Sequence, residues 1–304
     1  MKTRVLITGI CGFAGLHMSD YLKHLQSPPD VIGVDVKDGP PASCDSFYKL
    51  DLSCKDDVAE LIKQTKPGYV IHLAGIFGTE DPLEIYKVNV LSIAALLEAT
   101  RYYAPDVVMV TAGSAAEYGH IEPSRVPVDE RTSCEPVTPY GLSKLLATQI
   151  ALYYHRAFSI CVMVVRPFQL IGKGVTVGLA PGAFAQQVKQ VLSGKANVIK
   201  VGNLESSRDF LDIHDAVEAI WALCQEPAGG QVFNLCSGIP TKMSSLLEMM
   251  IENCGLNVKV EVDPGRLRGS TDISNIYGSF QKLKNHCRWN PKRSLDESIS
   301  EMFM

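Results

Sequence analysis

The sequence predicts an α/β protein in which a doubly wound parallel sheet is accompanied by a smaller C-terminal α/β lobe. Short runs of β-branched and aliphatic residues alternate with longer segments of helical apolar spacing, which is typical of βαβ units. The first of these runs leads into a glycine-rich turn. The chain has 304 residues, 46% of them hydrophobic, which is enough to bury a large core.

The glycine-rich turn separates a predicted strand, Arg4 to Thr8, from a predicted helix, Leu16 to Leu25. Glycines in that position let the backbone turn tightly and approach a pyrophosphate, which the helix N-terminus would hold through its free N–H groups and its dipole. The spacing is G-x-x-G-x-x-G. We therefore expect a dinucleotide-binding turn of the Rossmann type, made by Gly9, Gly12, Phe13, Ala14 and Gly15.

The next two predicted strands each place an aspartate near this turn. Asp35 ends the second strand, twenty residues past Gly15, where a carboxylate can accept both ribose hydroxyls and would repel a 2′-phosphate. We therefore favour NAD(H) as cofactor, with NADP(H) possible because Lys37 could accommodate the phosphate. A third strand, Tyr48 to Leu52, contains Asp51, which suits an adenine amino group, although aspartate is also a common helix cap.

Composition excludes several other classes of protein. A net charge of -4 leaves no electrostatic footprint for nucleic acid or an anionic membrane. No apolar run has the length of a membrane span, and the N-terminus has no signal-peptide pattern. The nine cysteines form no C-x-x-C pair and do not cluster with the seven histidines, so we expect reduced thiols and no metal site. These features predict a cytoplasmic protein.

Two more predicted strands, Tyr69 to Ala74 and Val107 to Thr111, lead to polar or glycine-containing segments. In an open parallel sheet the carboxyl ends of the strands line the ligand crevice. Ser114 would therefore lie where the nicotinamide end of a cofactor meets its substrate, although a serine can also simply satisfy a turn. The amphipathic segment between these strands, Leu83 to Tyr103, is of the type that packs in a dimer bundle, so we expect a homodimer.

Tyr140 and Lys144 are four residues apart at the predicted start of a helix, so their side chains share one helical face. A phenol exchanges protons slowly near neutral pH unless its anion is stabilised, and an ammonium one turn away can do this. Tyr140 is thus a candidate general acid or base. The same spacing also occurs in ordinary amphipathic helices whose lysine extends into water.

Taken together, these motifs resemble the extended short-chain dehydrogenase/reductases that modify nucleotide sugars. The resemblance covers the chain from near residue 3 to its C-terminus, and its specificity lies in the joint order and spacing of the motifs. It rests on the following residues: Thr8-Gly9-x-x-Gly12-Phe13-x-Gly15, Asp51-Leu52, His72-Leu73-Ala74-Gly75, Ser114 before Tyr118-Gly119, Pro139-Tyr140-x-x-x-Lys144 and Arg166-Pro167-Phe168.

This resemblance implies a catalytic triad of Ser114, Tyr140 and Lys144. It also implies cofactor contacts from Tyr140, Lys144, Leu52, Leu73, Ala74, Gly75 and Pro167. Dehydratases of the family normally carry carboxylates at the two positions after the serine. This chain has Ala115 and Ala116 there, and its acid, Glu117, comes one residue later. The resemblance therefore leaves ketoreduction or epimerisation.

We expect residues 1–167 to form the NAD(P)-binding domain, with its sheet completed by about 207–236, and residues 168–206 and 237–304 to form the nucleotide-sugar lobe. Two capping boxes, Ser245 with Glu248 and Ser294 with Glu297, predict late helix starts. The guanidinium groups of Arg208 and Arg268 suit a diphosphate, although exposed arginines are usually just solvated.

Within the family, the GDP-4-keto-6-deoxymannose reductases, which form GDP-rhamnose, are the most similar group. The likeness lies in Arg166-Pro167-Phe168-Gln169, with Gln169 at a substrate position where that group usually has asparagine, and in Asp263-Pro264-x-Arg266-Leu267-Arg268. The resemblance implies reduction of a 4-keto-6-deoxy sugar, with a GDP-sugar favoured as substrate. Two alternatives remain open: a 4-epimerase with tightly bound NAD, and a cofactor-sensing or scaffold protein on the same fold.

Overall fold

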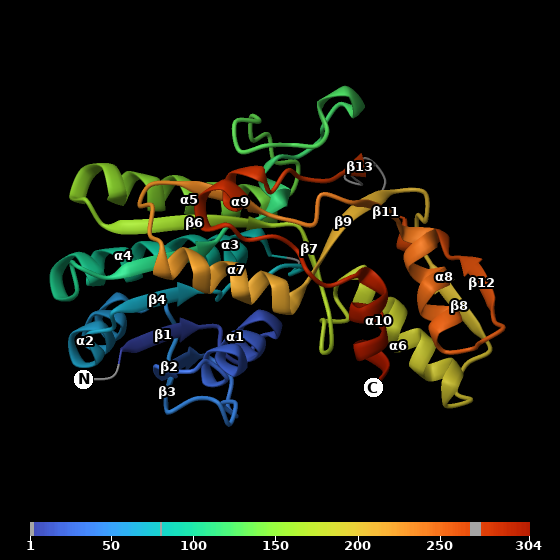
Figure 1. Cartoon of the computed structure of the whole chain (residues 1–304), viewed down its shortest axis with the longest axis horizontal. Coiled ribbons are helices and arrows are strands. Elements are labelled where there is room, and N and C mark those ends of the chain that lie inside the picture. Colours follow the sequence, from blue (N-terminus) through green and yellow to red (C-terminus); the bar gives the residue numbers. More distant parts are fainter. Residues whose placement is uncertain (1–2, 80, 268–274) are drawn as a thin grey trace.

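The computed structural model describes residues 3–79, 81–267 and 275–304. Its centre is a seven-stranded sheet in the order β10-β6-β5-β4-β1-β2-β3 (Figure 1). Every neighbouring pair in this sheet is parallel, which confirms the predicted fold class. The strands are β1 Arg4–Thr8, β2 Asp30–Asp35, β3 Ser46–Lys49, β4 Tyr69–His72, β5 Val108–Ala112, β6 Cys161–Pro167 and β10 Val232–Leu235.

Helices cover both faces of this sheet because successive side chains of a strand point to opposite faces. In β1, Val5 and Ile7 enter the core formed with α1 and α7, whereas Leu6 enters the core formed with α2, α4 and α5. A short helix and a π-helical turn, Lys87–Leu91, precede α4. These helices are α1 Phe13–Lys23, α2 Lys55–Thr65, α3 Pro82–Tyr86, α4 Ser92–Tyr103, α5 Pro139–Phe158 and α7 Ile213–Gln225.

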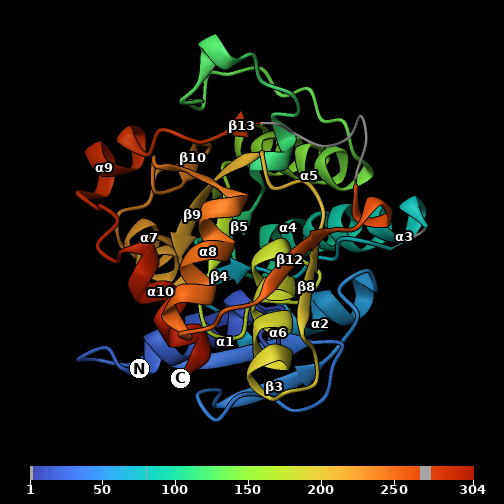
Figure 2. The same ribbon diagram turned by 90° about the vertical axis from the view of Figure 1, so that its right-hand side faces the viewer.

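A second, smaller layer of strands and helices lies beside the carboxyl ends of the main sheet (Figures 1 and 2). Here β9 pairs with β7, β11 and β13, and β8 pairs with β12. The lobe has its own apolar core, which includes Phe184, Phe210, Leu246 and Ile299. Its elements are β7 Gln169–Ile171, α6 Ala180–Leu192, β8 Val198–Val201, β9 Ser207–Asp212, β11 Pro240–Lys242, α8 Met243–Asn253, β12 Lys259–Val262, β13 Asn275–Ile276 and α10 Leu295–Phe303.

The C-terminal half of the chain alternates between the large sheet and the lobe. Residues 213–235 return to the large sheet as α7 and β10, whereas β9 belongs to the lobe. Later still, α9, Gln281–Cys287, brings Leu283 and then Trp289 into the apolar core beside α7. The C-terminal part of the chain therefore contributes to both cores.

Several local expectations were wrong in detail. The third strand ends at Lys49 rather than at Leu52. The segment from Leu83 to Tyr103 is not one helix, because the π-helical turn interrupts it. Ser245 and Glu248 form no capping box, since α8 already begins at Met243. The second capping box, Ser294 with Glu297, is confirmed at the start of α10.

Across residues 3–79, 81–267 and 275–304, no helix is long and apolar enough to cross a membrane.

Candidate active site

The glycine turn is held so tightly that side chains would not fit into it. Gly9 has a φ of +70°, and a Cβ there would lie 2.8 Å from the Ala74 backbone nitrogen. A Cβ on Gly15 would lie 2.6 Å from Ile10 Cα and overlap the Gly9 carbonyl oxygen. The turn therefore leads directly into the N-terminus of α1 with no side-chain bulk at its glycines. This is the shape that a bound pyrophosphate requires.

Asp35 contacts this turn. Its Oδ2 accepts a hydrogen bond from the Cys11 N–H at 2.9 Å, and its Oδ1 accepts one from the Lys37 N–H at 3.0 Å. The carboxylate thus stands at the carboxyl end of β2, beside the start of α1. This position is consistent with the expected ribose contact.

Replacing Asp35 with asparagine tests that contact. Asparagine keeps an oxygen acceptor but removes the charge that repels a 2′-phosphate. We expect the ratio of kcat/KM with NADPH to that with NADH to rise about tenfold, or roughly 1.4 kcal/mol. The control is Asp38→Asn, which removes an exposed carboxylate paired with Lys49. Equal ratios in wild type and Asp35→Asn would rule out the proposed role of Asp35.

Three other residues of the predicted cofactor set occupy distinct surroundings. Asp51 accepts a hydrogen bond from the Ser53 N–H and lies 3.8 Å from the Lys87 ammonium. The side chain of Leu52 is buried in the core near α2 and α4. The ring of Phe13 packs beside Gly172 and Gly174 of the lobe. Its side chain therefore contacts the lobe, while its backbone belongs to the glycine turn.

The predicted triad meets because α5 begins directly against the turn that contains Ser114. Thr138 caps α5 by accepting a hydrogen bond from the Gly141 N–H, and a Cβ on Gly141 would come within 2.5 Å of the Ala116 carbonyl oxygen. Ser114 in turn caps the short 3₁₀ helix Ala115–Glu117. This close packing brings the Tyr140 phenol to the Ser114 side chain, with which it interacts.

Lys144 lies one turn further along α5 and is buried, with 6% of its surface exposed. Its Nζ donates to the Ala112 carbonyl oxygen at 2.9 Å and lies 6.0 Å from the centre of the Tyr140 ring. Burial lowers the pKa of Lys144 to about 8, although Glu117 opposes this shift. At neutral pH the ammonium form therefore still predominates.

The pKa of Tyr140 differs from the expectation. Burial raises it above the ordinary value, Ser114 lowers it, and the charge of Glu117 raises it further. The expectation that Lys144 brings the phenol pKa down is therefore not met in this structure, where burial has the largest effect and Lys144 is not among the groups that shift this pKa. Tyr140 rests as a neutral phenol, which can donate a proton.

Tyr140 and Lys144 line a cavity of about 140 Å³ at the carboxyl ends of β4, β5 and β6, whereas Ser114 is not among its lining residues. Besides Tyr140 and Lys144, four residues of the predicted cofactor set line it, namely Ala14, Leu73, Gly75 and Pro167. The wall is mostly apolar and runs from the glycine turn to the phenol. A nicotinamide cofactor whose pyrophosphate occupies the turn would therefore reach Tyr140 and Lys144, so the residues present fit this cofactor.

A histidine and an asparagine form hydrogen bonds to residues that surround the site. His72 is buried, hydrogen-bonds the Thr8 hydroxyl at 2.7 Å, and has its pKa lowered to about 3 by burial and by Lys144; it is a core histidine. Asn89, in the π-helical turn, holds the backbone of Ile76 through two hydrogen bonds and donates to Ser143 Oγ. Asn89 lies outside the predicted site set, although an amide between Val88 and Val90 was a signal for it.

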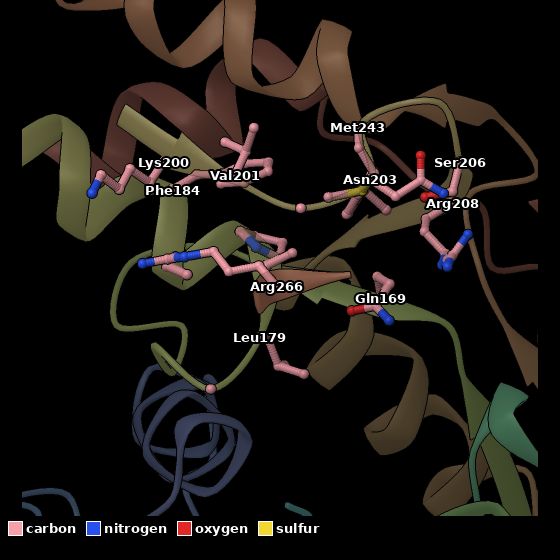
Figure 3. A pocket seen from close by; sticks show the side chains of 16 residues that line it. Gln169, Leu179, Phe184, Lys200, Val201, Asn203, Ser206, Arg208, Met243 and Arg266 are labelled. Atoms are coloured by element: carbon pink, nitrogen blue, oxygen red, sulfur yellow. The ribbon is translucent and has the colours of Figure 1, made fainter. Parts of the chain in front are cut away.

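A second cavity of about 240 Å³ lies in the lobe, and Figure 3 shows its lining. Gln169 and Arg208, both in the predicted substrate set, lie together on one side of it, and Arg266 and Lys200 lie towards the other. Arg266 was noted only as part of a motif. The predicted ligand Arg268 lies outside the described residues. The cavity thus combines three cationic side chains, which suits an anionic ligand.

A family comparison identifies the class of protein that this fold and site define. The chain belongs to the NAD-dependent epimerase/dehydratase family, whose model matches residues 5–236. It is accordingly an NAD(P)-dependent oxidoreductase of the short-chain dehydrogenase/reductase class, as the motifs had indicated.

Individual relatives are more distant. The chain is 28% identical to the GDP-6-deoxy-D-mannose reductase of Pseudomonas aeruginosa, over 98% of this chain and 95% of that protein. It is 26% identical to the GDP-6-deoxy-D-talose 4-dehydrogenase of Aggregatibacter actinomycetemcomitans, over 93% and 90%. It is also 26% identical to a putative UDP-glucose 4-epimerase of Methanocaldococcus jannaschii, over 98% and 96%.

Two solved structures with bound cofactors are also similar to this chain. RMD from Pseudomonas aeruginosa complexed with NADPH has a TM-score of 0.87 at 27% identity, covering 99% of this chain and 97% of that one. The UDP-glucose 4-epimerase of Thermus thermophilus in complex with NAD has a TM-score of 0.86 at 25% identity, with coverage of 99% and 97%. A protein complexed with NADPH and an epimerase complexed with NAD therefore share this fold.

Proposed function

We propose that the protein uses NAD(P)H to reduce the 4-keto group of a nucleotide-linked 4-keto-6-deoxyhexose, with GDP-4-keto-6-deoxymannose as substrate and GDP-rhamnose as product. The observation that carries this proposal is the state of the catalytic residues. Tyr140 is a neutral phenol beside Ser114, and the neighbouring acid, Glu117, is fully buried. The site thus has a proton donor for a ketone and lacks the extra acid that expulsion of water needs.

Each residue has a defined part in this proposal. Tyr140 donates its proton to the oxygen of the carbonyl as negative charge develops there, and Ser114 donates a hydrogen bond to the same oxygen. Lys144, as an ammonium, stabilises the phenolate that remains and holds a ribose hydroxyl of the cofactor. The bound reduced nicotinamide supplies the hydride. The cations of the lobe cavity hold the nucleotide diphosphate.

A stoichiometric assay tests this function. Purified protein is incubated with NADH or NADPH and with the 4-keto-6-deoxy sugar made from GDP-mannose, while the absorbance of the reduced cofactor is followed and the product is identified. We expect one cofactor oxidised per sugar reduced. An absence of oxidation with both cofactors would reject the substrate.

A second candidate is a nucleotide-sugar 4-epimerase with tightly bound NAD. The acidic side chain at Asp35 favours this candidate because it suits NAD, and epimerases are among the relatives. An epimerase first uses its tyrosine as a base and later returns the proton, whereas a reductase needs only the proton donor. Interconversion of UDP- or GDP-sugars without consumption of reductant would establish this alternative.

Arg208 is proposed to bind the diphosphate of the substrate. Replacing it with alanine should raise KM for the nucleotide sugar at least about tenfold with a smaller effect on kcat, because a charge-assisted hydrogen bond made equally to substrate and transition state is lost. Initial rates over a range of sugar concentrations give both constants. Arg125→Ala, in an exposed turn, serves as the control. An unchanged KM in Arg208→Ala would place the diphosphate elsewhere.

We further propose that the protein works as a homodimer in the cytoplasm. Large apolar side chains are exposed on α4 and α5, among them Tyr102, Leu142, Leu146 and Tyr153, and pairing of these helices between two copies would cover them. All nine cysteines are free, which suits a reducing compartment. Light scattering from the purified protein measures its mass in solution.

A further inference from the structure

Glu117 joins three parts of the active site. Its Oε1 accepts hydrogen bonds from the Ser114 N–H at 2.9 Å and from the Thr148 hydroxyl at 3.0 Å. Its Oε2 accepts one from Arg166 Nε, also at 2.9 Å. These partners lie on the catalytic turn, on α5 and on β6 respectively. One carboxylate therefore connects the segment that carries Ser114 to the helix that carries Tyr140.

The surrounding chain leaves space for this carboxylate and closes it off from water. A Cβ on Gly113 would overlap Glu117 Oε1, so a side chain at position 113 would displace the carboxylate. Glu117 itself is 0% exposed. The far side of Arg166 is also held, because its Nη1 donates to the Tyr118 hydroxyl, which donates to Asn234 Oδ1 at 2.6 Å. Such a fully connected buried network restricts its members to one arrangement.

We propose that Glu117 is the positioning residue of this active site, fixing Ser114 relative to Tyr140 and presenting its carboxylate to the Tyr140–Lys144 pair. It does so from behind the catalytic turn and touches neither the sugar nor the cofactor. This role rests on the proposed function, in which Tyr140 is the proton donor.

The charge of Glu117 shifts the pKa values of Tyr140 and Lys144 in the same direction. It raises the pKa of Tyr140 and the pKa of Lys144. Other titratable or charged groups nearby are buried His72, whose low pKa keeps it neutral, Arg166, which pairs with Glu117, and Tyr118 and Cys134, whose raised pKa values keep them neutral. The carboxylate thus keeps the phenol protonated and the ammonium charged to higher pH, which is the state that a reduction needs.

Two substitutions distinguish the effect of the charge of Glu117 from the effect of its side-chain length. Glu117→Gln keeps an oxygen acceptor for Ser114 and Thr148 but removes the charge. Glu117→Asp keeps the charge but is one methylene shorter, so the hydrogen bond to the Ser114 N–H lengthens. The matched control is Glu98→Gln, which also removes a carboxylate that pairs with an arginine, Arg101, but lies away from the site. Circular dichroism and thermal unfolding establish the temperature at which every variant is folded.

The pH profile of kcat/KM for ketone reduction reports the charge. In Glu117→Gln we expect its alkaline limb to move to lower pH by roughly one unit, because removal of a negative charge lowers the pKa of both Lys144 and Tyr140. In Glu117→Asp the limb should stay in place while kcat falls about tenfold through loss of alignment. Glu98→Gln should match wild type in both respects.

Titration of Tyr140 gives a measurement that needs no sugar substrate. Protein labelled with ¹³C at the tyrosine Cζ is titrated by NMR, and the Tyr140 resonance is identified by its absence in Tyr140→Phe. We expect its titration to move to lower pH in Glu117→Gln and not in Glu98→Gln. If the wild type reduces no ketone, the proposed function fails while this titration still tests Glu117. An unshifted titration in Glu117→Gln, or wild-type kcat in Glu117→Asp, would overturn the inference.

Discussion

Replacement of Tyr140 by phenylalanine should reduce kcat for the nucleotide sugar by at least about a hundredfold, because the change removes the only atom of that side chain that can donate a proton. The ring stays in place, since its packing against Phe77, with ring centres 6.3 Å apart, involves no hydroxyl. The cofactor dissociation constant should therefore change little. Single-turnover oxidation of NAD(P)H measures the chemical step, and fluorescence titration measures cofactor binding.

The matched control is Tyr153→Phe, because Tyr153 lies on the same helix but is 51% exposed. It should retain wild-type kinetics.

The pH profile adds a second check on the mechanism. Reduction needs a neutral phenol and a charged Lys144, and both forms are lost as pH rises. Because the pKa of Lys144 is about 8, the alkaline limb should begin near that value. Near-wild-type turnover in Tyr140→Phe would eliminate Tyr140 as the proton donor.

Replacement of Arg166 by methionine is expected to lower the free energy of unfolding by about 3–5 kcal/mol, because it leaves a buried carboxylate without its counter-ion. The side chains of Arg166 and Glu117 are 6% and 0% exposed, so water cannot replace the lost partner. Methionine retains much of the aliphatic volume and avoids a large cavity. Urea-induced unfolding measures the change.

The comparison variant for this experiment is Arg131→Met. Arg131 also pairs with a carboxylate, that of Asp129, but its side chain is 91% exposed, so solvent takes over when the pair is lost and stability should scarcely change. Equal losses in the two arginine variants would mean that burial contributes nothing to the Glu117–Arg166 pair. A smaller loss in Arg166→Met than in Arg131→Met would lead to the same conclusion.

The arrangement of Glu117 also explains how this chain departs from the dehydratase pattern. The sequence showed two alanines after Ser114 and an acid one position late. In the structure the late position turns the carboxylate behind the 3₁₀ turn, where it pairs with Arg166 at 2.9 Å. The carboxylate is thus held by Arg166 and does not line the cavity, so it is not placed to protonate a leaving hydroxyl there.

The sequence by itself determined the sheet, the glycine turn and the shared helix face of Tyr140 and Lys144, because these depend on local patterns. Alternation of apolar runs with helical spacing predicted β1, α1 and β2, and the four-residue interval predicted that Tyr140 and Lys144 share a face of α5. Local steric rules and helix periodicity are the same in any protein. The substrate and the reaction, which distinguish one member of the family from another, do not follow from such local patterns.

Only the tertiary structure decided which polar groups support the site. Asn89 contacts Ser143, Glu117 contacts Arg166, and Arg266 reaches the lobe cavity. The members of the first two pairs are 54 and 49 residues apart. No short-range pattern encodes such pairs, because it is the packing of separate strands and helices that removes water between them and makes each group depend on its partner.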